Sequence, residues 1–283
     1  MGKKDTIHLA VLGAGTVGTG VYKVIKNLEE DMIHKIGGNL VISKILVRDA
    51  SKKRDGIDTS LLTDQWEEIV NDKDIDIIVE VMGGIEPAKT YITEALQAGK
   101  SVVTANKDLM AEHGKELLDL AESNGCDLMF EASVAGGIPI LRPLKHCLAA
   151  NHMTEVVGIV NGTTNFILSK MTDEGVGFEE TLKLAQDLGY AEADPTADVE
   201  GLDAARKVAI MASIAFNSRV TFEDVYTEGI TEITAKDIEY AKDMDCVIKL
   251  LGVAKNTEDG IEVRVHPMLI DKHHPLASVN DSF

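Results

Sequence analysis

A glycine-rich turn near the N-terminus constrains the fold of this chain more than any other feature of its sequence. The apolar run His8–Leu12 ends on Gly13, and the turn then reads Gly-Ala-Gly-Thr-Val-Gly as far as Gly18. Val21 and Ile25 follow at helical spacing, so the motif lies between a predicted strand and a predicted helix. This context is typical of the first βαβ unit of a Rossmann-type fold.

The same turn predicts a bound dinucleotide. Gly13 permits the tight turn, Gly15 lets the backbone approach a pyrophosphate, and Gly18 lets the helix pack closely on the strand. The helix N-terminus favours an anion because its N–H groups are unpaired and its dipole is positive there. We therefore expect the cofactor contacts to come from Gly13, Gly15, Thr16, Val17 and Gly18.

The end of the second predicted strand bears on the choice of dinucleotide. An acidic residue at this point accepts hydrogen bonds from the ribose of NAD, whereas an arginine receives the 2′-phosphate of NADP. This chain offers both, Arg48 and Asp49, followed by the basic segment Ser51–Arg54. We predict that NADP is accepted, and NAD stays open. A solvated basic turn would explain the same charges.

Alternation of β-branched runs with amphipathic segments predicts an α/β first half. The expected fold class is α/β, a Rossmann-type doubly wound parallel sheet followed by a second α+β domain. We place an NAD(P)-binding domain at 1–138 and a second domain at 139–283. Strands are expected over Ile7–Leu12, Leu40–Val47, Ile77–Val81, Ser101–Thr104 and Asp127–Phe130, and helices over Thr16–His34, Pro87–Gln97 and Leu109–Asn124.

Strands and helices are segregated in the second half, which indicates an α+β domain. A helix over Pro139–Leu148 precedes a strand over Met153–Val160, and three helical patterns follow. Two strands are then expected over Cys246–Ala254 and Ile261–Pro267. The turn-rich connector Asn256–Gly260 predicts that these two strands form a hairpin.

Composition excludes several classes of partner. A formal net charge of −19 would repel phosphate backbones, so nucleic acid is not expected. No apolar stretch reaches the roughly 18 residues of a membrane helix, and the N-terminus lacks a signal peptide's apolar region. Cys126, Cys147 and Cys246 are odd in number and far apart, which suits neither a disulfide framework nor clustered zinc. We expect a cytoplasmic protein.

An acid–lysine pair marks the second half. The polar segment Gly189–Asp198 leads into a predicted helix, in which Asp203 and Lys207 are four residues apart and share one face. That face continues into the apolar residues Ile210 and Ile214. A pair turned toward a packed interior indicates a functional site. An exposed surface pair is an equal alternative, and such a pair would contribute only about 0.3–0.5 kcal/mol to the free energy of unfolding.

Two further positions follow predicted parallel strands. Lys107 stands just after Ser101–Thr104, at the sheet edge where open α/β folds bind ligands. The loop Glu131–Pro139 is rich in small residues whose carbonyl oxygens, together with the Glu131 side chain, can hold a hard cation. A surface lysine and a simple connecting loop are the alternatives for these two positions.

Five segments of the chain, among them the glycine turn and the segment with the acid–lysine pair, together resemble homoserine dehydrogenase over essentially the whole chain. The resemblance implies an NAD(P)-dependent oxidoreductase that interconverts L-homoserine and L-aspartate 4-semialdehyde, in the biosynthesis of threonine and methionine. Its motifs occur here in the family's order, which makes chance agreement improbable. They are Gly13–Gly18, Thr104–Lys107, Glu131–Pro139, Asn161–Asn165 and Gly189–Lys207.

By matching position, the resemblance also implies roles for single residues. Glu192 and Asp203 would hold the amino-acid part of the substrate, and Lys207 would be the acid/base group. Lys107 would lie between nicotinamide and substrate, as a second catalytic residue that also contacts the cofactor. Gly189 would touch the cofactor.

A metal ion and an assembly follow from the same resemblance. Family members often bind sodium, which here would be held at Glu131, Val134, Gly136 and Ile138. The family pairs through its second domain, so a homodimer is expected. Residues 139–283 would then be the substrate-binding, catalytic and dimerisation domain.

One departure from the family concerns the end of the chain. Homoserine dehydrogenases normally continue with a Gly-rich segment that closes over the nicotinamide, whereas this sequence stops at Phe283. We therefore predict a C-terminally truncated homoserine dehydrogenase. A non-catalytic NADP-binding module is the alternative, although such a module would need none of the predicted catalytic lysines and acids.

Overall fold

The computed structural model describes residues 5–282. The chain divides into two compact units, Met1–Gly137 and Ile138–Phe283, so the division lies one residue before the predicted boundary. Among the described residues, one sheet has six strands and the other has four. No helix in this part of the chain is both long enough and apolar enough to cross a membrane.

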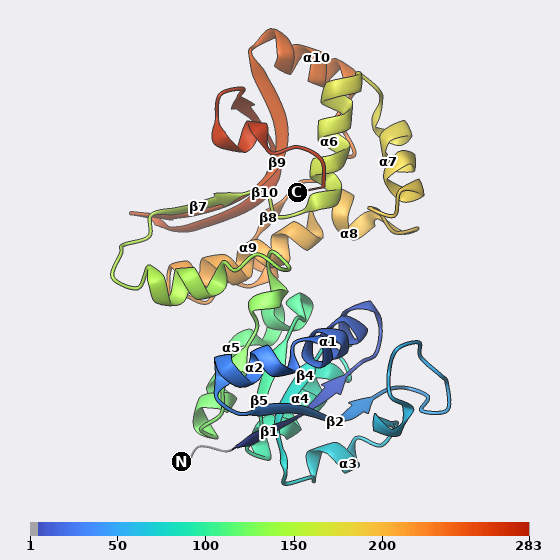
Figure 1. Ribbon diagram of the computed structural model, residues 1–283. Coiled ribbons are helices and arrows are strands. Elements are labelled where there is room, and N and C mark those ends of the chain that lie inside the picture. The colour runs from blue at the N-terminus through green and yellow to red at the C-terminus, as the bar shows by residue number, and fades with distance from the viewer. Residues whose placement is uncertain (1–4, 283) are drawn as a thin grey trace. The chain divides into compact units, whose positions relative to one another are not determined.

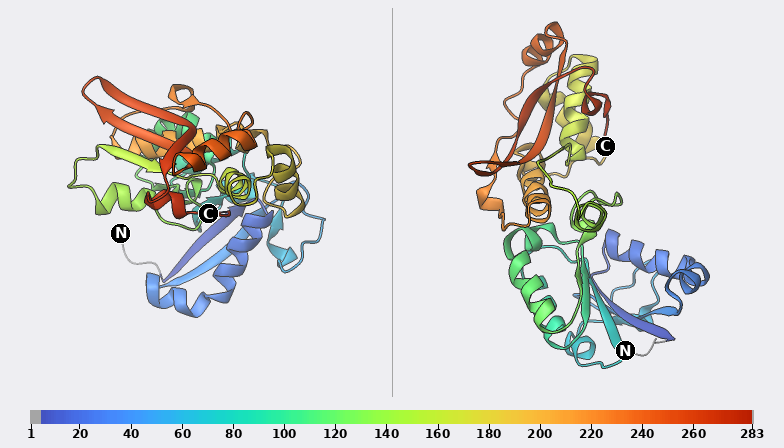
Figure 2. Two further views of the ribbon diagram at one scale, coloured as in Figure 1. Left: turned by 90° about the horizontal axis from the view of Figure 1, so that it is seen from above. Right: turned by 90° about the vertical axis from the view of Figure 1, so that its left-hand side faces the viewer.

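The first unit contains a parallel sheet in the order β3-β2-β1-β4-β5-β6. Helices α1 and α2 cover one face, and α4 and α5 cover the other (Figures 1 and 2). This arrangement confirms the predicted doubly wound, Rossmann-type fold. The strands are β1 (Thr6–Leu12), β2 (Asn39–Leu46), β3 (Leu62–Thr63), β4 (Ile75–Glu80), β5 (Ser101–Thr104) and β6 (Leu128–Met129). The helices are α1 (Thr16–Asn27), α2 (Glu29–Ile36), α3 (Glu67–Val70), α4 (Ala88–Gln97) and α5 (Lys107–Ser123), with short 3-10 turns at Thr59–Leu61 and Glu131–Ser133.

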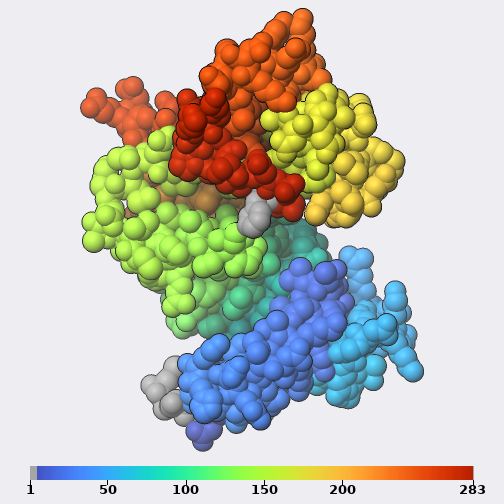
Figure 3. All heavy atoms as spheres, turned by 45° about the horizontal axis from the view of Figure 1, so that its top comes forward, coloured from blue at the N-terminus to red at the C-terminus, as the bar shows by residue number. Residues whose placement is uncertain are grey.

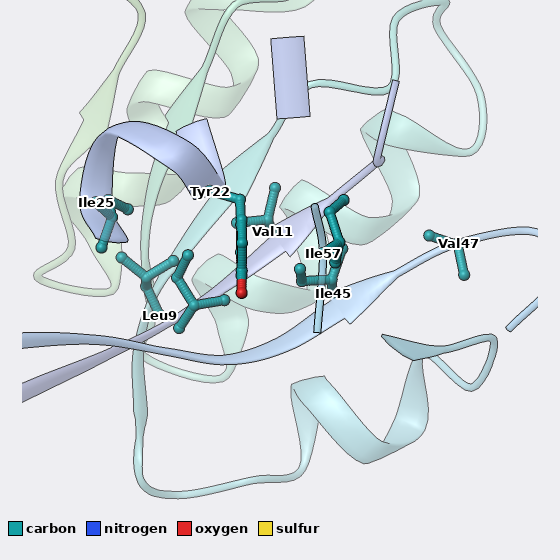
Figure 4. Close-up of a cluster of buried hydrophobic side chains, with 8 residues drawn as sticks. Leu9, Val11, Tyr22, Ile25, Ile45, Val47 and Ile57 are labelled. Atoms are coloured by element: carbon teal, nitrogen blue, oxygen red, sulfur yellow. The ribbon is translucent and has the colours of Figure 1, made fainter. Parts of the chain in front are cut away.

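A buried apolar cluster fixes α1 against the sheet (Figure 4). Leu9 and Val11 alternate along β1 and so point to the same face, where Tyr22 and Ile25 of α1 meet them. The cluster consists of Leu9, Val11, Tyr22, Ile25, Ile42, Ile45, Val47 and Ile57. Its packing holds the start of α1 directly after β1, which is where the glycine turn lies.

One expectation for the first unit was wrong in detail, and two short elements were not predicted. The helix predicted over Thr16–His34 is interrupted at Leu28, whose backbone leaves the helical region (φ −110°, ψ 20°). Three acidic residues then occupy the first turn of α2, where the helix dipole favours negative charge. The short elements β3 and α3 were not predicted, because segments of two and four residues carry no measurable periodicity.

The second unit contains a mixed sheet in the order β7-β9-β10-β8, which confirms the α+β prediction. β9 and β10 form the expected antiparallel hairpin. The strands are β7 (Glu155–Gly158), β8 (Tyr226–Thr227), β9 (Cys246–Thr257) and β10 (Gly260–Asp271). The helices are α6 (Gly162–Glu174), α7 (Phe178–Asp187), α8 (Thr196–Val199), α9 (Leu202–Ala215) and α10 (Ala235–Asp243), with 3-10 turns at Phe222–Asp224 and Pro275–Ser278.

The helix predicted over Pro139–Leu148 is shorter and differently wound. Its regular part is a π-helix over Pro143–Cys147, closed by a hydrogen bond from the Leu148 N–H to the Pro143 carbonyl oxygen at 3.0 Å. Pro143 stands at one of the first positions of this helix, where its missing N–H costs no hydrogen bond.

β9 is one of the two inner strands of this sheet, and its residues Ile248–Ala254 are all buried. A Cβ atom on Gly252 would lie 2.2 Å from Cγ2 of Val208 in α9. Only glycine therefore allows α9 to pack this closely on the strand. The contact also places Lys207, the residue before Val208, beside the loop that follows β7.

The last described residues lie beside α6 (Figure 1), and Figure 3 shows this C-terminal segment in red at the surface of the second unit. The Asn165 side-chain amide in α6 donates hydrogen bonds to the carbonyl oxygens of Val279 at 3.2 Å and Asp281 at 3.0 Å. This segment is therefore an ordered part of the second unit.

Candidate functional site

The glycine turn has the geometry that a pyrophosphate site requires. Gly13 adopts a positive φ of 105°, and its N–H donates to the Leu46 carbonyl oxygen of β2 at 3.0 Å. A Cβ atom on Gly18 would lie only 2.0 Å from the Gly13 carbonyl oxygen. A larger residue at position 18 would thus push α1 away from the end of β1.

The N-terminus of α1 is open to an anion. Gly15 occupies the capping position, no side chain caps the helix, and its first turn carries no acidic residue. Gly15, Thr16 and Val17 are exposed. Unpaired N–H groups at such a terminus bind phosphate well, so the residues present fit a dinucleotide.

The turn after β2 separates the roles of its two charged residues. The Asp49 carboxylate accepts hydrogen bonds from the Ser51 N–H at 2.9 Å and the Ser51 hydroxyl at 2.6 Å. These hydrogen bonds hold the pKa of Asp49 below its ordinary value. Arg48 is exposed beside it. Both residues are exposed, and the turn engages the Asp49 carboxylate in its own hydrogen bonds.

Lys107 is the first residue of α5 and follows β5 almost directly. Asn106 caps this helix, since its side-chain oxygen accepts a hydrogen bond from the Leu109 N–H at 3.1 Å. The helix begins two residues earlier than predicted. Lys107 therefore lies, half-buried, at the carboxyl edge of the parallel sheet, the same edge as Gly13.

Asp203 and Lys207 form a close ion pair on α9, with 2.6 Å between Lys207 Nζ and Asp203 Oδ2. Their side chains are only 10% and 19% exposed, which rules out an exposed surface pair. Lys207 Nζ also donates to the carbonyl oxygen of Val160, after β7, at 2.8 Å. Two elements of the second unit thus fix the position of this amine.

Asn161 belongs to the same cluster, although no role was predicted for it. Its side-chain amide donates hydrogen bonds to Asp198 Oδ1 at 2.7 Å and to Asp203 Oδ2 at 2.9 Å. Its side-chain oxygen caps α6 by accepting from the Thr164 N–H at 2.8 Å. An asparagine between a predicted strand and a helix is a capping signal, but sequence spacing does not reveal its contact with Asp203.

The loop Gly189–Glu192 is fastened to the start of α6. The Thr163 hydroxyl donates to the Tyr190 carbonyl oxygen at 2.8 Å, and the ring centroids of Tyr190 and Phe166 are 4.8 Å apart. Gly189 has a positive φ of 79°. Gly189 and the predicted substrate ligand Glu192 are exposed in this loop.

The predicted cation ligands follow β6. Glu131 is half-buried, Val134 is buried, and Gly136 is exposed. Ile138 begins the second unit. Within residues 5–282, His, Cys, Asp and Glu side chains form no group of three or more that could hold a metal. A cation at this loop would therefore depend on backbone carbonyl oxygens in addition to Glu131.

Comparison with known proteins agrees with this arrangement. Residues 13–131 match the family described as the homoserine dehydrogenase NAD binding domain, and residues 139–283 match the homoserine dehydrogenase family. The chain is 51% identical to the homoserine dehydrogenase of Bacillus subtilis over 278 residues, covering 98% of this chain and 64% of that protein. It thus spans about two thirds of the length of that curated relative.

Solved structures show the same similarity. A homoserine dehydrogenase from Thiobacillus denitrificans superposes with a TM-score of 0.94 at 45% identity, covering 98% of this chain and 64% of that one. A hyperthermophilic archaeal homoserine dehydrogenase in complex with NADPH superposes with a TM-score of 0.79 at 26% identity, covering 96% of this chain and 84% of that one.

Proposed function

Because this chain belongs to the homoserine dehydrogenase family, we propose that it carries the cofactor-binding and catalytic parts of an NAD(P)-dependent oxidoreductase. This enzyme interconverts L-homoserine and L-aspartate 4-semialdehyde, in the biosynthesis of threonine and methionine. The observation that carries the proposal is the buried Asp203–Lys207 pair, held by the Val160 carbonyl oxygen and the Asn161 amide.

The hydrogen bonds of Lys207 suit a proton-transfer role. Oxidation of an alcohol needs a base to take the hydroxyl proton as the hydride leaves, and the dinucleotide, when bound, accepts that hydride. A neutral lysine amine has two N–H donors and one lone pair. The Val160 carbonyl oxygen and Asp203 Oδ2 use both donors, which leaves the lone pair available for a substrate hydroxyl. In the reverse reaction the third N–H of the ammonium group protonates the developing alkoxide.

The remaining predicted site residues have complementary roles in this proposal. Glu192 and Asp203 hold the amino-acid part of the substrate through its ammonium group, which suits their negative charge. Lys107 lies between nicotinamide and substrate, and Gly189 contacts the cofactor. The location of Lys107 at the carboxyl edge of the sheet supports its role.

We propose that NADP is accepted, with NAD also possible, because Arg48 is exposed while the Asp49 carboxylate is engaged by Ser51. The expected result of an Arg48→Ala substitution is a roughly tenfold higher KM for NADP with little change for NAD, since one charge-assisted hydrogen bond to the 2′-phosphate is lost. Steady-state kinetics with both cofactors measure this ratio.

The matched control for this prediction is Lys53→Ala, which removes an exposed positive charge from the same turn. A smaller effect is expected there. An unchanged ratio of the KM values for NADP and NAD in the Arg48 variant would show that the arginine does not bind the 2′-phosphate.

Three further properties belong to the proposal. The protein is cytoplasmic, in line with its three free cysteines. It forms a homodimer through the second unit, and it binds sodium at Glu131 and backbone oxygens of Val134, Gly136 and Ile138. The half-buried Glu131 carboxylate supports the sodium site, because hard cations prefer oxygen ligands.

An assay of homoserine oxidation tests the whole proposal. NADPH and NADH formation is followed with this chain, and with the chain extended by the remaining third that its relatives contain. Homoserine-dependent reduction of NADP by the extended protein is expected. Its absence there would reject the proposed reaction. NADP binding without turnover in this chain, together with turnover in the extended protein, would identify the shorter chain as the non-catalytic module.

A further inference from the structure

Glu80 is a fully buried carboxylate (0% exposed) at the last position of β4. Its two oxygens reach different segments. Oε1 accepts hydrogen bonds from the backbone N–H groups of Met82 at 2.8 Å and Gly83 at 3.3 Å, and Oε2 accepts from the Thr104 hydroxyl at 2.6 Å. Glu80 therefore connects the loop after β4 with the end of β5.

The connection continues toward Lys107. The Thr104 hydroxyl oxygen accepts a hydrogen bond from the Asn106 N–H at 3.0 Å. The Asn106 side chain then donates to the Gly84 carbonyl oxygen at 2.6 Å while it caps α5. Because Lys107 is the next residue, this series of hydrogen bonds fixes where α5 begins and where its first side chain starts.

The loop that Glu80 Oε1 holds lies beside the glycine turn. The Val81 N–H donates to the Leu12 carbonyl oxygen at 3.0 Å. A Cβ atom on Gly13 would lie 3.2 Å from Cγ of Met82, so the loop held by Glu80 packs directly on this turn. β1 and β4 are adjacent strands whose helices cover opposite faces of the sheet, which is the topological switch point.

We propose that Glu80 is a positioning residue for the reaction, which sets Lys107 relative to the dinucleotide-binding turn. This inference rests on the proposed function. All three described hydrogen bonds of the carboxylate go to segments at the ligand-binding edge, and none goes to the apolar core. A buried carboxylate is costly unless it is fully hydrogen-bonded, so its presence here reflects a need for fixed geometry at this edge.

The substitution Glu80→Gln keeps the side-chain shape but gives Thr104 a donor where it had an acceptor. We expect kcat to fall about tenfold, because small displacements of a catalytic group are costly, while KM for homoserine changes less than threefold. The control is Glu68→Gln in α3, an exposed carboxylate that also accepts from a threonine hydroxyl, that of Thr63 in the edge strand β3, at 3.0 Å. Its kcat should stay at the wild-type value.

A pair of Thr104 variants makes the test independent of the folding of Glu80→Gln. Thr104→Val removes the hydroxyl and should reproduce the tenfold loss of kcat. Thr104→Ser keeps the hydroxyl and should retain at least half of the wild-type kcat. Thermal unfolding of each variant is measured in parallel.

All measurements use whichever of the original and extended chains is active. If neither wild-type protein oxidises homoserine, the proposed function fails. If the wild type is active and Glu80→Gln retains its kcat, or Thr104→Ser is as impaired as Thr104→Val, the role of Glu80 is overturned. An equal loss in Glu68→Gln would overturn it as well.

Discussion

Replacement of Lys207 by alanine is expected to lower kcat about 10²–10⁴-fold, the usual contribution of a positioned acid/base group. The substitution removes the amine that donates hydrogen bonds to both the Val160 carbonyl oxygen and Asp203 Oδ2, and with it the proposed acid/base group. NADPH affinity should remain unchanged, because Lys207 is not among the proposed cofactor contacts. Stopped-flow or steady-state turnover and NADPH fluorescence titration measure the two quantities separately.

The chain supplies a matched control for this variant. Lys183 and Asp187 on α7 form another lysine–aspartate pair with the same spacing, at 2.5 Å, but both side chains are exposed. Lys183→Ala should leave turnover unchanged, since exposed pairs of this kind contribute little. Near-normal turnover in Lys207→Ala would remove this lysine from the acid/base role, and weakened NADPH binding would argue for a different role in cofactor binding.

Replacement of Lys249 by methionine is expected to lower the free energy of unfolding by about 3 kcal/mol, because it leaves buried acceptors without a donor. Lys249 lies in β9 and is only 3% exposed. Its Nζ donates to the Val279 carbonyl oxygen at 2.6 Å, to Asn165 Oδ1 at 2.9 Å and to the Ser169 hydroxyl at 3.2 Å. Urea denaturation measures the loss.

The control for this prediction lies on the same strand. Lys255 pairs with Glu155 of β7 at 2.8 Å, and both side chains are well exposed. Lys255→Met should therefore change the free energy of unfolding by less than about 1 kcal/mol. Equal losses in both variants would mean that the buried hydrogen bonds of Lys249 contribute no more to the free energy of unfolding than the exposed Lys255–Glu155 pair does.

The pH dependence of the Lys249 effect has a definite sign. Burial lowers the pKa of Lys249 to about 8, although the carboxylates of Asp173 and Asp281 oppose the shift. Above this pKa the folded protein holds a neutral amine while the unfolded chain still binds a proton, so the unfolded state binds more protons and stability rises with pH.

The free energy of unfolding of the wild type, relative to Lys249→Met, should therefore increase by about 1–2 kcal/mol between pH 8 and pH 10. Below pH 8 the lysine is charged in both states, and the difference between the two proteins should be flat. A difference that falls with rising pH would contradict the lowered pKa.

Local spacing was enough to predict part of the fold and of the site. The glycine turn specified the first strand, the first helix and their close packing, because each glycine acts on its own neighbours. Asp203 and Lys207 were placed on one face by helical geometry alone. The sheet order was predictable as a class, since alternating strands and helices leave few possible connections.

Contacts between distant segments were not predictable in the same way. Asn161 meets Asp203 only because the loop after β7 lies beside α9, and Glu80 meets Thr104 only because β4 and β5 pair in that register. The burial of Lys249 runs against the general tendency of lysine to be exposed. Strand register and helix packing decide all three, and neither follows from spacing along one segment.

The first turns of α6 serve two buried networks at once, and this limits how the helix can evolve. Asn161 at its start holds Asp203, while Asn165, one turn later, accepts from Lys249 and binds the segment around Val279. A mutation that improved one network by shifting or rotating the helix would disturb the other. Accepted substitutions in α6 should therefore gather on its exposed end, at Glu174. Change at the polar positions of its first turns should require compensating changes in two distant segments.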